Sequence, residues 1–233
     1  MSAEFSNIYI QPIFVQPMFI LFDWDGTIAR KEIAEEAALL RLKMLGVHKS
    51  KQWIQEAQKT QAHYDITKKA ISELTGLTTD RDLTVVMTNL FQICYLATVN
   101  KHKQEVFYEK LHLTLENLKV QYGLKYGIVS TLREDIVKPS VELLGVAHLF
   151  EYVVGNTPEL LYSKTDLVRK LKKEKPALIV GDRKDDLMAG KEMGVKTAYA
   201  IWGHGMAEDT ELADYVLRKP EELKEVVEKL LLK

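Results

Sequence analysis

The chain has 233 residues, of which 46% are apolar, and its 32 basic and 33 acidic residues give a formal net charge of -1. A chain of this length and composition can form one large domain, or a core domain with an insertion, around a sizeable hydrophobic core. The balanced charge gives no net field that would attract nucleic acid or an anionic membrane surface. We therefore expect a globular protein that binds neither.

Two features concern the cellular location. Cys94 is the single cysteine, which excludes an intrachain disulfide and makes the cytoplasm the default expectation. No stretch reaches the roughly 18 uninterrupted apolar residues of a membrane-spanning helix, and residues 1–17 lack the basic start of a secretory signal. Residues 1–17 form either an extra edge strand or arm, or an extension upstream of a folded part that begins near Met18. We favour the extension.

Residues 18–28, which read MFILFDWDGTI, are the stretch around which the rest of the chain is organised. The run from Phe19 to Phe22 is typical of a strand that is buried on both faces, and Gly26 predicts the turn that ends it. Because side chains alternate along a strand, Asp23 and Asp25 should point to one side and share one small pocket. Two carboxylates this close repel each other unless they share a cation or a proton, so the turn indicates a functional site.

Between residues 30 and 112 the sequence changes to helical patterns without a buried-strand run. Apolar residues recur at helical spacing from Ile33 to Leu45, and Gly46 follows them as a C-cap. Further helices are predicted at 51–61, 66–74, 83–99 and 104–112. We interpret residues 30–112 as a helical cap domain that is inserted after the first strand.

From residue 113 onward, helices and strands alternate. Strands are predicted at 126–130, 151–155, 177–182 and 197–201, and helices at 114–123, 135–145 (broken by Pro139), 167–173, 187–193 and 220–233. This alternation predicts βαβ units and a parallel sheet that is covered on both faces. The expected fold is therefore α/β, with a doubly wound, Rossmann-like core of residues 18–29 and 113–233 and an inserted all-helical cap.

Polar residues follow several predicted strands, at the edge where doubly wound sheets bind ligands. They are Asp23 and Asp25 after the first strand, Ser130 and Thr131 after the second, Asp182, Asp185 and Asp186 after the strand at 177–182, and Lys164 in a further loop. An ionised carboxylate can attack phosphorus, carboxylate oxygens suit Mg2+, and a hydroxyl with an ammonium can cradle phosphoryl oxygens. Taken singly, these residues could also be turn residues, helix caps or surface charges. Gathered at one edge, they indicate phosphoryl-transfer chemistry.

These motifs resemble those of the haloacid dehalogenase (HAD) superfamily, on its phosphatase branch, and the chain is similar to phosphoglycolate phosphatases with a helical, C1-type cap. FDWDGTI matches the first motif of the family, IVST the second, the lysine of YSKTDL the third, and VGDRKDD with LMAG the fourth. The resemblance covers residues 18–233, through motifs in the core and by position only in the cap.

The resemblance implies a role for each acid of the site. Asp23 would be the nucleophile, and Asp25 the general acid and base. Mg2+ would be held by Asp23, the backbone carbonyl of Asp25, Asp182 and Asp186. The spacing of the fourth motif selects Asp186 over Asp185, which could still orient a water molecule or the lysine.

The resemblance also implies the binding of the phosphoryl group and the reaction. Ser130, Thr131 and Lys164 would bind the phosphoryl oxygens. We expect a Mg2+-dependent phosphatase that hydrolyses small phosphorylated metabolites through an aspartyl phosphate. A phosphomutase, which returns the phosphoryl group to a sugar, is the alternative among enzymes. A non-catalytic protein that binds a phosphorylated metabolite is the alternative from another class.

Overall fold

The computed structural model describes residues 17–60, 69, 72, 73, 76, 81–157, 160, 162–171 and 174–232. Residues 1–16, which belong to the expected extension, lie outside this part, as does most of the helix expected at 66–74. None of the helices in the described part combines the length and apolar character required to cross a bilayer.

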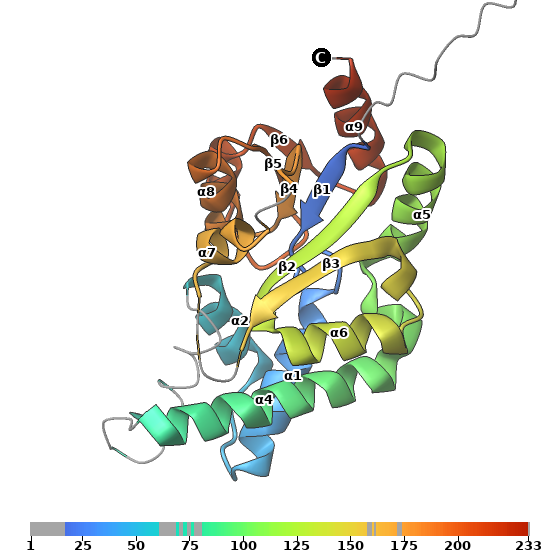
Figure 1. Cartoon of the computed structure of the whole chain (residues 1–233). Coiled ribbons are helices and arrows are strands. Elements are labelled where there is room, and N and C mark those ends of the chain that lie inside the picture. The colour runs from blue at the N-terminus through green and yellow to red at the C-terminus, as the bar shows by residue number, and fades with distance from the viewer. Residues whose placement is uncertain are drawn as a thin grey trace, which may run out of the picture.

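Six parallel strands form one sheet in the order β3-β2-β1-β4-β5-β6 (Figure 1). They are β1 (Phe19–Phe22), β2 (Lys125–Arg133), β3 (Phe150–Asn156), β4 (Leu178–Gly181), β5 (Lys196–Ala200) and β6 (Tyr215–Leu217). The chain continues from the central β1 to one side and later returns to the other, so the strand order reverses at β1. The expected α/β class and parallel sheet are confirmed. The sequence prediction missed β6, whose three residues are too few to show a strand period.

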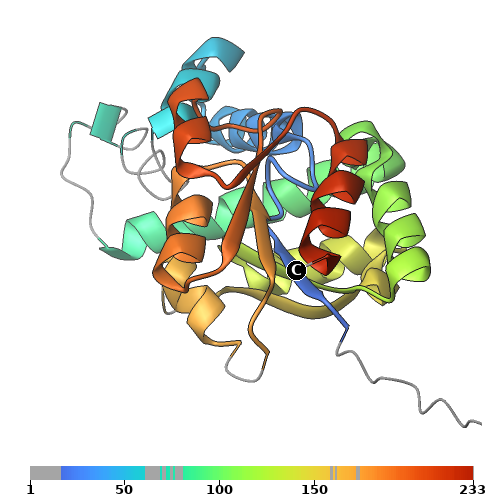
Figure 2. The same cartoon turned by 90° about the horizontal axis from the view of Figure 1, so that it is seen from above.

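The alternating side chains of β1 build both faces of the sheet. Ile20 and Phe22 belong to a core cluster with the apolar faces of α5 (Leu111–Tyr122), α6 (Glu134–Leu143) and α9 (Leu223–Leu231). Phe19 and Leu21 belong to a second cluster with α7 (Lys164–Arg169) and α8 (Lys184–Glu192). Figure 2 shows α5 and α9 on one side of the strands and α7 and α8 on the other. Complete burial of a large apolar side chain stabilises the fold by about 1.5–3 kcal/mol, so β1 is fixed firmly between the two layers.

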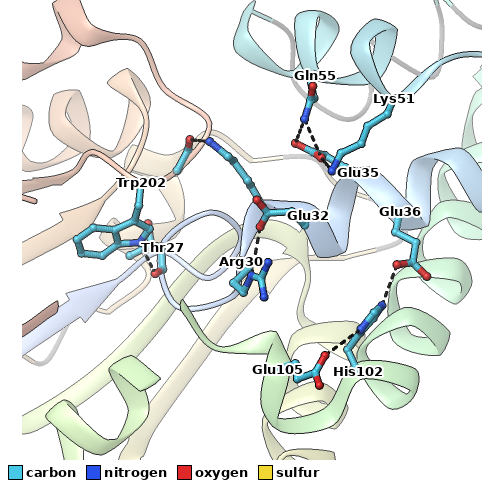
Figure 3. A network of polar contacts seen from close by, with 12 residues as sticks. Thr27, Arg30, Glu32, Glu35, Glu36, Lys51, Gln55, His102, Glu105 and Trp202 are labelled. Atoms are coloured by element: carbon cyan, nitrogen blue, oxygen red, sulfur yellow. Dashed lines mark hydrogen bonds and ion pairs between the residues drawn. The ribbon is translucent and has the colours of Figure 1, made fainter. Parts of the chain in front are cut away.

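A second group of helices lies beyond the carboxyl ends of the strands (Figure 1). It contains α1 (Lys31–Met44), α2 (Lys51–Thr60) and α4 (Arg81–His102). Ile33 of α1 and Phe91 of α4 are buried in the same cluster as Phe22 of the sheet. The buried Glu35 joins α1 to α2, because Gln55 Nε2 donates to both of its carboxylate oxygens at 3.1 Å and Lys51 Nζ lies 3.1 Å away (Figure 3).

The chain leaves the sheet after β1 and returns to it at a neighbouring point. The backbone N–H of Arg30 donates to Val106 O at 2.8 Å, and the N–H of Tyr108 donates to Ile28 O at 3.1 Å. The two connections are therefore hydrogen-bonded to each other.

Trp202, in the loop after β5, contacts both connections. Its indole N–H donates to the carbonyl oxygen of Thr27 at 3.0 Å (Figure 3), and its ring stacks on Tyr108 with centroids 4.7 Å apart. The loop after β5 thus fixes the place where the helices α1, α2 and α4 join the sheet.

Two helix predictions were wrong in detail. The helix expected at 104–112 is instead two short 3-10 turns, Lys103–Val106 and Tyr108–Lys110, and Glu109 and Lys110 have positive φ angles of 37° and 60°. The apolar spacing across this stretch imitates a helical period, but the left-handed residues end the helical path. Pro139 does not break α6, because proline removes a single backbone donor while the buried Val137 and Val141 hold the helix on the sheet.

Candidate functional site

A cavity of about 690 Å³ lies at the carboxyl ends of β1, β2 and β4. Of the residues predicted from the sequence, it is lined by Asp23, Asp25, Ser130, Thr131, Lys164 and Asp185. Asp182 and Asp186 are completely buried next to these residues, with exposed fractions of 0% and 1%. The structure therefore brings the predicted residues together, although they come from four separate stretches of the chain.

Lys164 connects two of the acids. Its ammonium group contacts Asp23 Oδ1, lies 2.8 Å from Asp186 Oδ1, and donates to the carbonyl oxygen of Val129 at 3.1 Å. Lys164 is the first residue of α7, and the preceding Ser163 caps this helix by accepting a hydrogen bond from Asp166 N at 3.1 Å. The cap fixes the start of the helix, and with it the position of the lysine.

Asp182, directly after β4, is held by two donors. Thr27 Oγ1 donates to its Oδ1 at 3.1 Å, and the backbone N–H of His204 donates to its Oδ2 at 2.6 Å. The backbone of the first turn approaches closely as well, because a Cβ atom on Gly26 would lie 2.3 Å from Asp182 Oδ2. Gly26 also has a φ angle of 90°, a conformation that glycine adopts without a steric cost. The turn after β1 therefore needs glycine for both reasons.

Asp186 lies in the first turn of α8 and accepts a hydrogen bond from the backbone N–H of Arg183 at 3.1 Å. A Cβ atom on Gly181, at the end of β4, would lie 2.3 Å from the Asp186 side chain. Asp185 is different, because it is exposed and lines the cavity. The four-residue spacing that selects Asp186 therefore chooses the acid that is buried beside Lys164.

Three buried carboxylates form a group that fits a hard cation. Asp23, Asp182 and Asp186 each offer an oxygen atom, and these oxygens lie within 4.8 Å of one another. Carboxylate oxygens at this separation suit the ligand preference of Mg2+. Burial raises the pKa of Asp23 and Asp186 to about 7 and that of Asp182 to about 6, although Lys164 opposes the shift at Asp23 and Asp186. A bound cation would remove this cost.

Asp25 has different neighbours from these three acids. The hydroxyl group of Tyr95 donates to its Oδ1 at 3.4 Å, and His204 Nε2 lies 3.3 Å from its Oδ2. Burial acts to lower the pKa of His204, but the nearby Asp25 outweighs it and raises the pKa. Asp25 also lines the cavity, so its carboxyl group can reach a bound ligand while these two residues orient it.

Ser130 and Thr131 lie in the last part of β2. Ser130 is 1% exposed, and its Oγ accepts a hydrogen bond from the backbone N–H of Leu132 at 3.2 Å. Because Oγ is the acceptor in this bond, the hydroxyl hydrogen of Ser130 is not used there and can be donated to another acceptor. Thr131 is exposed, and its carbonyl oxygen accepts a hydrogen bond from Asn156 Nδ2 at 2.8 Å. Both residues face the cavity that contains Asp23.

The comparison with protein families agrees with this arrangement. A family model described as haloacid dehalogenase-like hydrolase matches residues 20–200. The chain belongs to this family. This hydrolase is 32% identical to a phosphoglycolate phosphatase from Aquifex aeolicus (strain VF5) over 221 residues, which cover 88% of the chain and 93% of that protein. The resemblance inferred from the motifs is thereby confirmed at the level of the family.

Two solved structures show the same fold. A predicted phosphatase from Clostridium acetobutylicum superposes with a TM-score of 0.71 at 20% identity, covering 91% of this hydrolase and 99% of that chain. The β-phosphoglucomutase (pgmB) from Clostridium difficile superposes with a TM-score of 0.67 at 14% identity, covering 93% and 98%. At these identities the similarity concerns the fold alone, which is therefore common to proteins named phosphatase and mutase.

Three residues of the hydrolase lie at the site although the sequence did not predict a role for them. They are Thr27, Tyr95 and His204. Thr27 follows the motif glycine, which is a signal that could have been used. Tyr95 lies 70 positions from Asp25, and helical periodicity indicates only that it faces inward. His204 lies in a glycine-containing loop that reads as an ordinary turn.

Proposed function

We propose that this hydrolase is a Mg2+-dependent phosphatase of small phosphorylated metabolites and that it acts through an aspartyl phosphate on Asp23. The position of Asp23 is the observation that carries the proposal. Its carboxylate lines the cavity, contacts the ammonium group of Lys164, and belongs to the group of three buried carboxylates. A nucleophile that attacks a phosphate dianion needs such compensation, because two negative charges must approach each other.

The reaction would proceed in two steps at these residues. In the first, an Asp23 oxygen forms a bond to phosphorus while the ester P–O bond breaks, and the leaving oxygen keeps the electron pair and takes the proton of Asp25. In the second, a water oxygen forms a bond to phosphorus and gives a proton to Asp25, and the electron pair of the Asp23–phosphorus bond returns to Asp23. The products are the alcohol and inorganic phosphate.

Asp23, the carbonyl oxygen of Asp25, Asp182 and Asp186 would hold the Mg2+ ion. Bound there, the cation supplies positive charge that offsets the phosphoryl oxygens. Asp182 and Asp186 are themselves fixed by Thr27, His204 and Arg183. The chain therefore orients these oxygens without the aid of a ligand, which favours binding.

Ser130, Thr131 and Lys164 would bind the phosphoryl group. Ser130 retains a hydroxyl hydrogen for a phosphoryl oxygen, and Thr131 presents its side chain from the next position of the strand. The ammonium group of Lys164 lies on the Asp23 carboxylate, so it also lies close to any group that Asp23 attacks. Charge-assisted hydrogen bonds of this kind are about twice as strong as neutral ones.

We further infer that residues 30–112 form a helical cap over a core of residues 18–29 and 113–233. The helices α1, α2 and α4 lie beyond the carboxyl ends of the strands (Figure 1), and Asp23 and Asp25 line the cavity at this edge of the sheet. A cap in this place can exclude water during the first step. The single cysteine supports a cytoplasmic location for the reaction, because it offers no partner for an intrachain disulfide.

The direct test is hydrolysis of p-nitrophenyl phosphate. We expect turnover with Mg2+, none in excess EDTA, and none from Asp23→Asn. Asp185→Asn is the matched control, because this acid lies outside the group of three carboxylates and should retain most of the activity. Hydrolysis that survives EDTA, or a fully active Asp23→Asn, would contradict the mechanism. With a sugar phosphate, release of inorganic phosphate supports the phosphatase and an isomerised product supports the mutase.

A further inference from the structure

The carboxyl group of Asp25 is held from two sides by residues that are far apart in the sequence. Tyr95 belongs to α4 and donates its hydroxyl hydrogen to Oδ1 at 3.4 Å. His204 belongs to the loop after β5, and its Nε2 lies 3.3 Å from Oδ2. One contact comes from the helical group beyond the sheet and the other from the loop after β5, so Asp25 lies between them.

The three residues that form these contacts are largely buried. Tyr95 is completely buried, and His204 and Asp25 each expose 7% of their surface. A water molecule therefore cannot readily replace either side chain, and polar contacts in such surroundings are stronger than in water. The two contacts therefore restrict the rotation of the Asp25 carboxyl group.

The loop that carries His204 is itself immobilised against the site. The backbone N–H of His204 donates to Asp182 Oδ2 at 2.6 Å, and the indole N–H of Trp202 donates to Thr27 O at 3.0 Å. A Cβ atom on Gly203 would lie 2.2 Å from the Asp182 side chain, and one on Gly205 would lie 2.0 Å from Asp182 O. The close backbone approach at these two glycines fixes the backbone of the loop, in which the imidazole Nε2 of His204 lies beside Asp25.

Tyr95 is equally constrained within α4. It is part of the large core cluster, and its ring lies 6.1 Å from that of Phe91, which is also buried. The hydroxyl group of Tyr95 thus connects the helical group to Asp25, which follows β1. If α4 moves away from the sheet, this hydrogen bond is lost while the contact from His204 remains.

We propose that Tyr95 and His204 are positioning residues that aim the Asp25 carboxyl at the leaving oxygen of the substrate. The inference rests on the proposed function, in which Asp25 gives its proton to that oxygen as the ester P–O bond breaks. Neither residue needs to touch the substrate. Tyr95 additionally makes proton donation depend on the helical group being in place over the site.

The dependence of the rate on the leaving group tests this directly. Phenyl phosphate needs a proton on its leaving oxygen, whereas the nitrophenolate of p-nitrophenyl phosphate leaves readily without one, and the two esters are nearly the same size. Small displacements of a reacting group can cost up to about 100-fold in rate. We expect Tyr95→Phe to lower kcat/KM about 10-fold for phenyl phosphate and less than about threefold for p-nitrophenyl phosphate, in the same direction as Asp25→Asn.

Tyr126→Phe is the matched control. Tyr126 is also completely buried, but its hydroxyl donates to Leu115 O at 3.1 Å, away from Asp25. This variant removes the same atom from the same type of residue, and it should change kcat/KM for the two esters by equal factors. The role of Tyr95 would be overturned if Tyr95→Phe also lowered kcat/KM for the two esters by equal factors, or left both values unchanged.

His204 gives an independent second test. His204→Ala should show the selective loss for phenyl phosphate, and His204→Gln, whose amide nitrogen reaches about the position of Nε2, should recover part of it. Equal losses for both esters in His204→Ala would overturn the role of His204. If the wild-type enzyme does not hydrolyse p-nitrophenyl phosphate with Mg2+, the proposed function itself fails. If the wild-type enzyme hydrolyses it but no variant loses activity selectively for phenyl phosphate, only the positioning role is refuted.

Discussion

The ammonium nitrogen of Lys164 lies 2.8 Å from Asp186 Oδ1, and both side chains are almost completely buried. Removal of one partner from a buried ion pair leaves an uncompensated charge, which costs about 3–5 kcal/mol. We therefore expect Lys164→Met to lower the free energy of unfolding by this amount in EDTA at pH 8, as measured by urea titration. Lys138→Met is the control, since Lys138 pairs with Glu134 while half exposed, and it should change stability by less than about 0.5 kcal/mol. A Lys164→Met protein as stable as its control would show that the pair is not needed.

The metal-free enzyme should lose stability as the pH rises. Burial raises the pKa of Asp23 and Asp186 to about 7 and of Asp182 to about 6, above their unfolded value of 3.8. The folded state therefore holds more protons than the unfolded state between these values, so the free energy of unfolding falls as pH rises from about 4 to about 7, by about 1.4 kcal/mol per pH unit for each proton by which the two states differ. Urea titrations in EDTA at several pH values measure this slope.

Magnesium should reverse this loss. A ligand that binds only the folded state stabilises it by mass action, by about 2.7 kcal/mol at 100 times its dissociation constant. Because protons compete with the cation for the same oxygens, we expect Mg2+ to raise the melting temperature at pH 8 and to have little effect at pH 5. Asp186→Asn should reduce both the pH slope and the Mg2+ effect. A metal-free protein that gains stability between pH 5 and 8 would contradict the assignment.

Gly26→Ala should damage the site through Asp182. The new methyl group would meet Asp182 Oδ2 at 2.3 Å and His204 Cδ2 at 2.7 Å, and overpacking of this kind costs about 1–3 kcal/mol. The matched control is Gly145→Ala, because Gly145 also has a positive φ, of 73°, but has no atom within 4 Å of a Cβ. Both variants carry the backbone strain, and only Gly26→Ala should also lose phosphatase activity with Mg2+. Equal activity of the two would argue against the close approach.

Asp25→Asn should lower kcat/KM for phenyl phosphate by about 10² to 10⁴, the usual contribution of a general acid. The variant keeps the shape of the side chain and cannot transfer a proton. Steady-state rates at saturating Mg2+ measure the loss, and the melting temperature shows whether the fold is intact. A rate within threefold of wild type would assign proton transfer to another group.

The sheet and most of the site could be predicted from local patterns. The apolar run of Phe19 to Phe22 and the glycine after it define a buried strand with two acids at its end, and alternation of helix and strand brings later acids to the same edge. The connection at 103–110 could not be predicted, since Glu109 and Lys110 adopt positive φ angles without being glycine. Nothing in the local sequence marks such residues.

The neighbours of Asp25 were also beyond prediction. Tyr95 and His204 reach it across 70 and 179 positions of sequence, and each lies in a pattern that has an ordinary structural explanation. Helical periodicity says which face of α4 is buried but not which polar atom it meets. Contacts of this kind depend on how the helical group is placed on the sheet, which requires the three-dimensional fold.

The hydrogen bond of 2.8 Å between Arg30 N and Val106 O has a consequence for how this enzyme can vary. The segment between Arg30 and Val106 starts and ends at neighbouring points of the sheet. A change in its length therefore does not alter the distance between these two points. Loop-closure entropy grows only by about 0.6 kcal/mol for each doubling of length. A change in the length of this segment would therefore cost the fold little loop-closure entropy, provided that buried residues such as Ile33 and Phe91 keep their contacts with the core of the sheet.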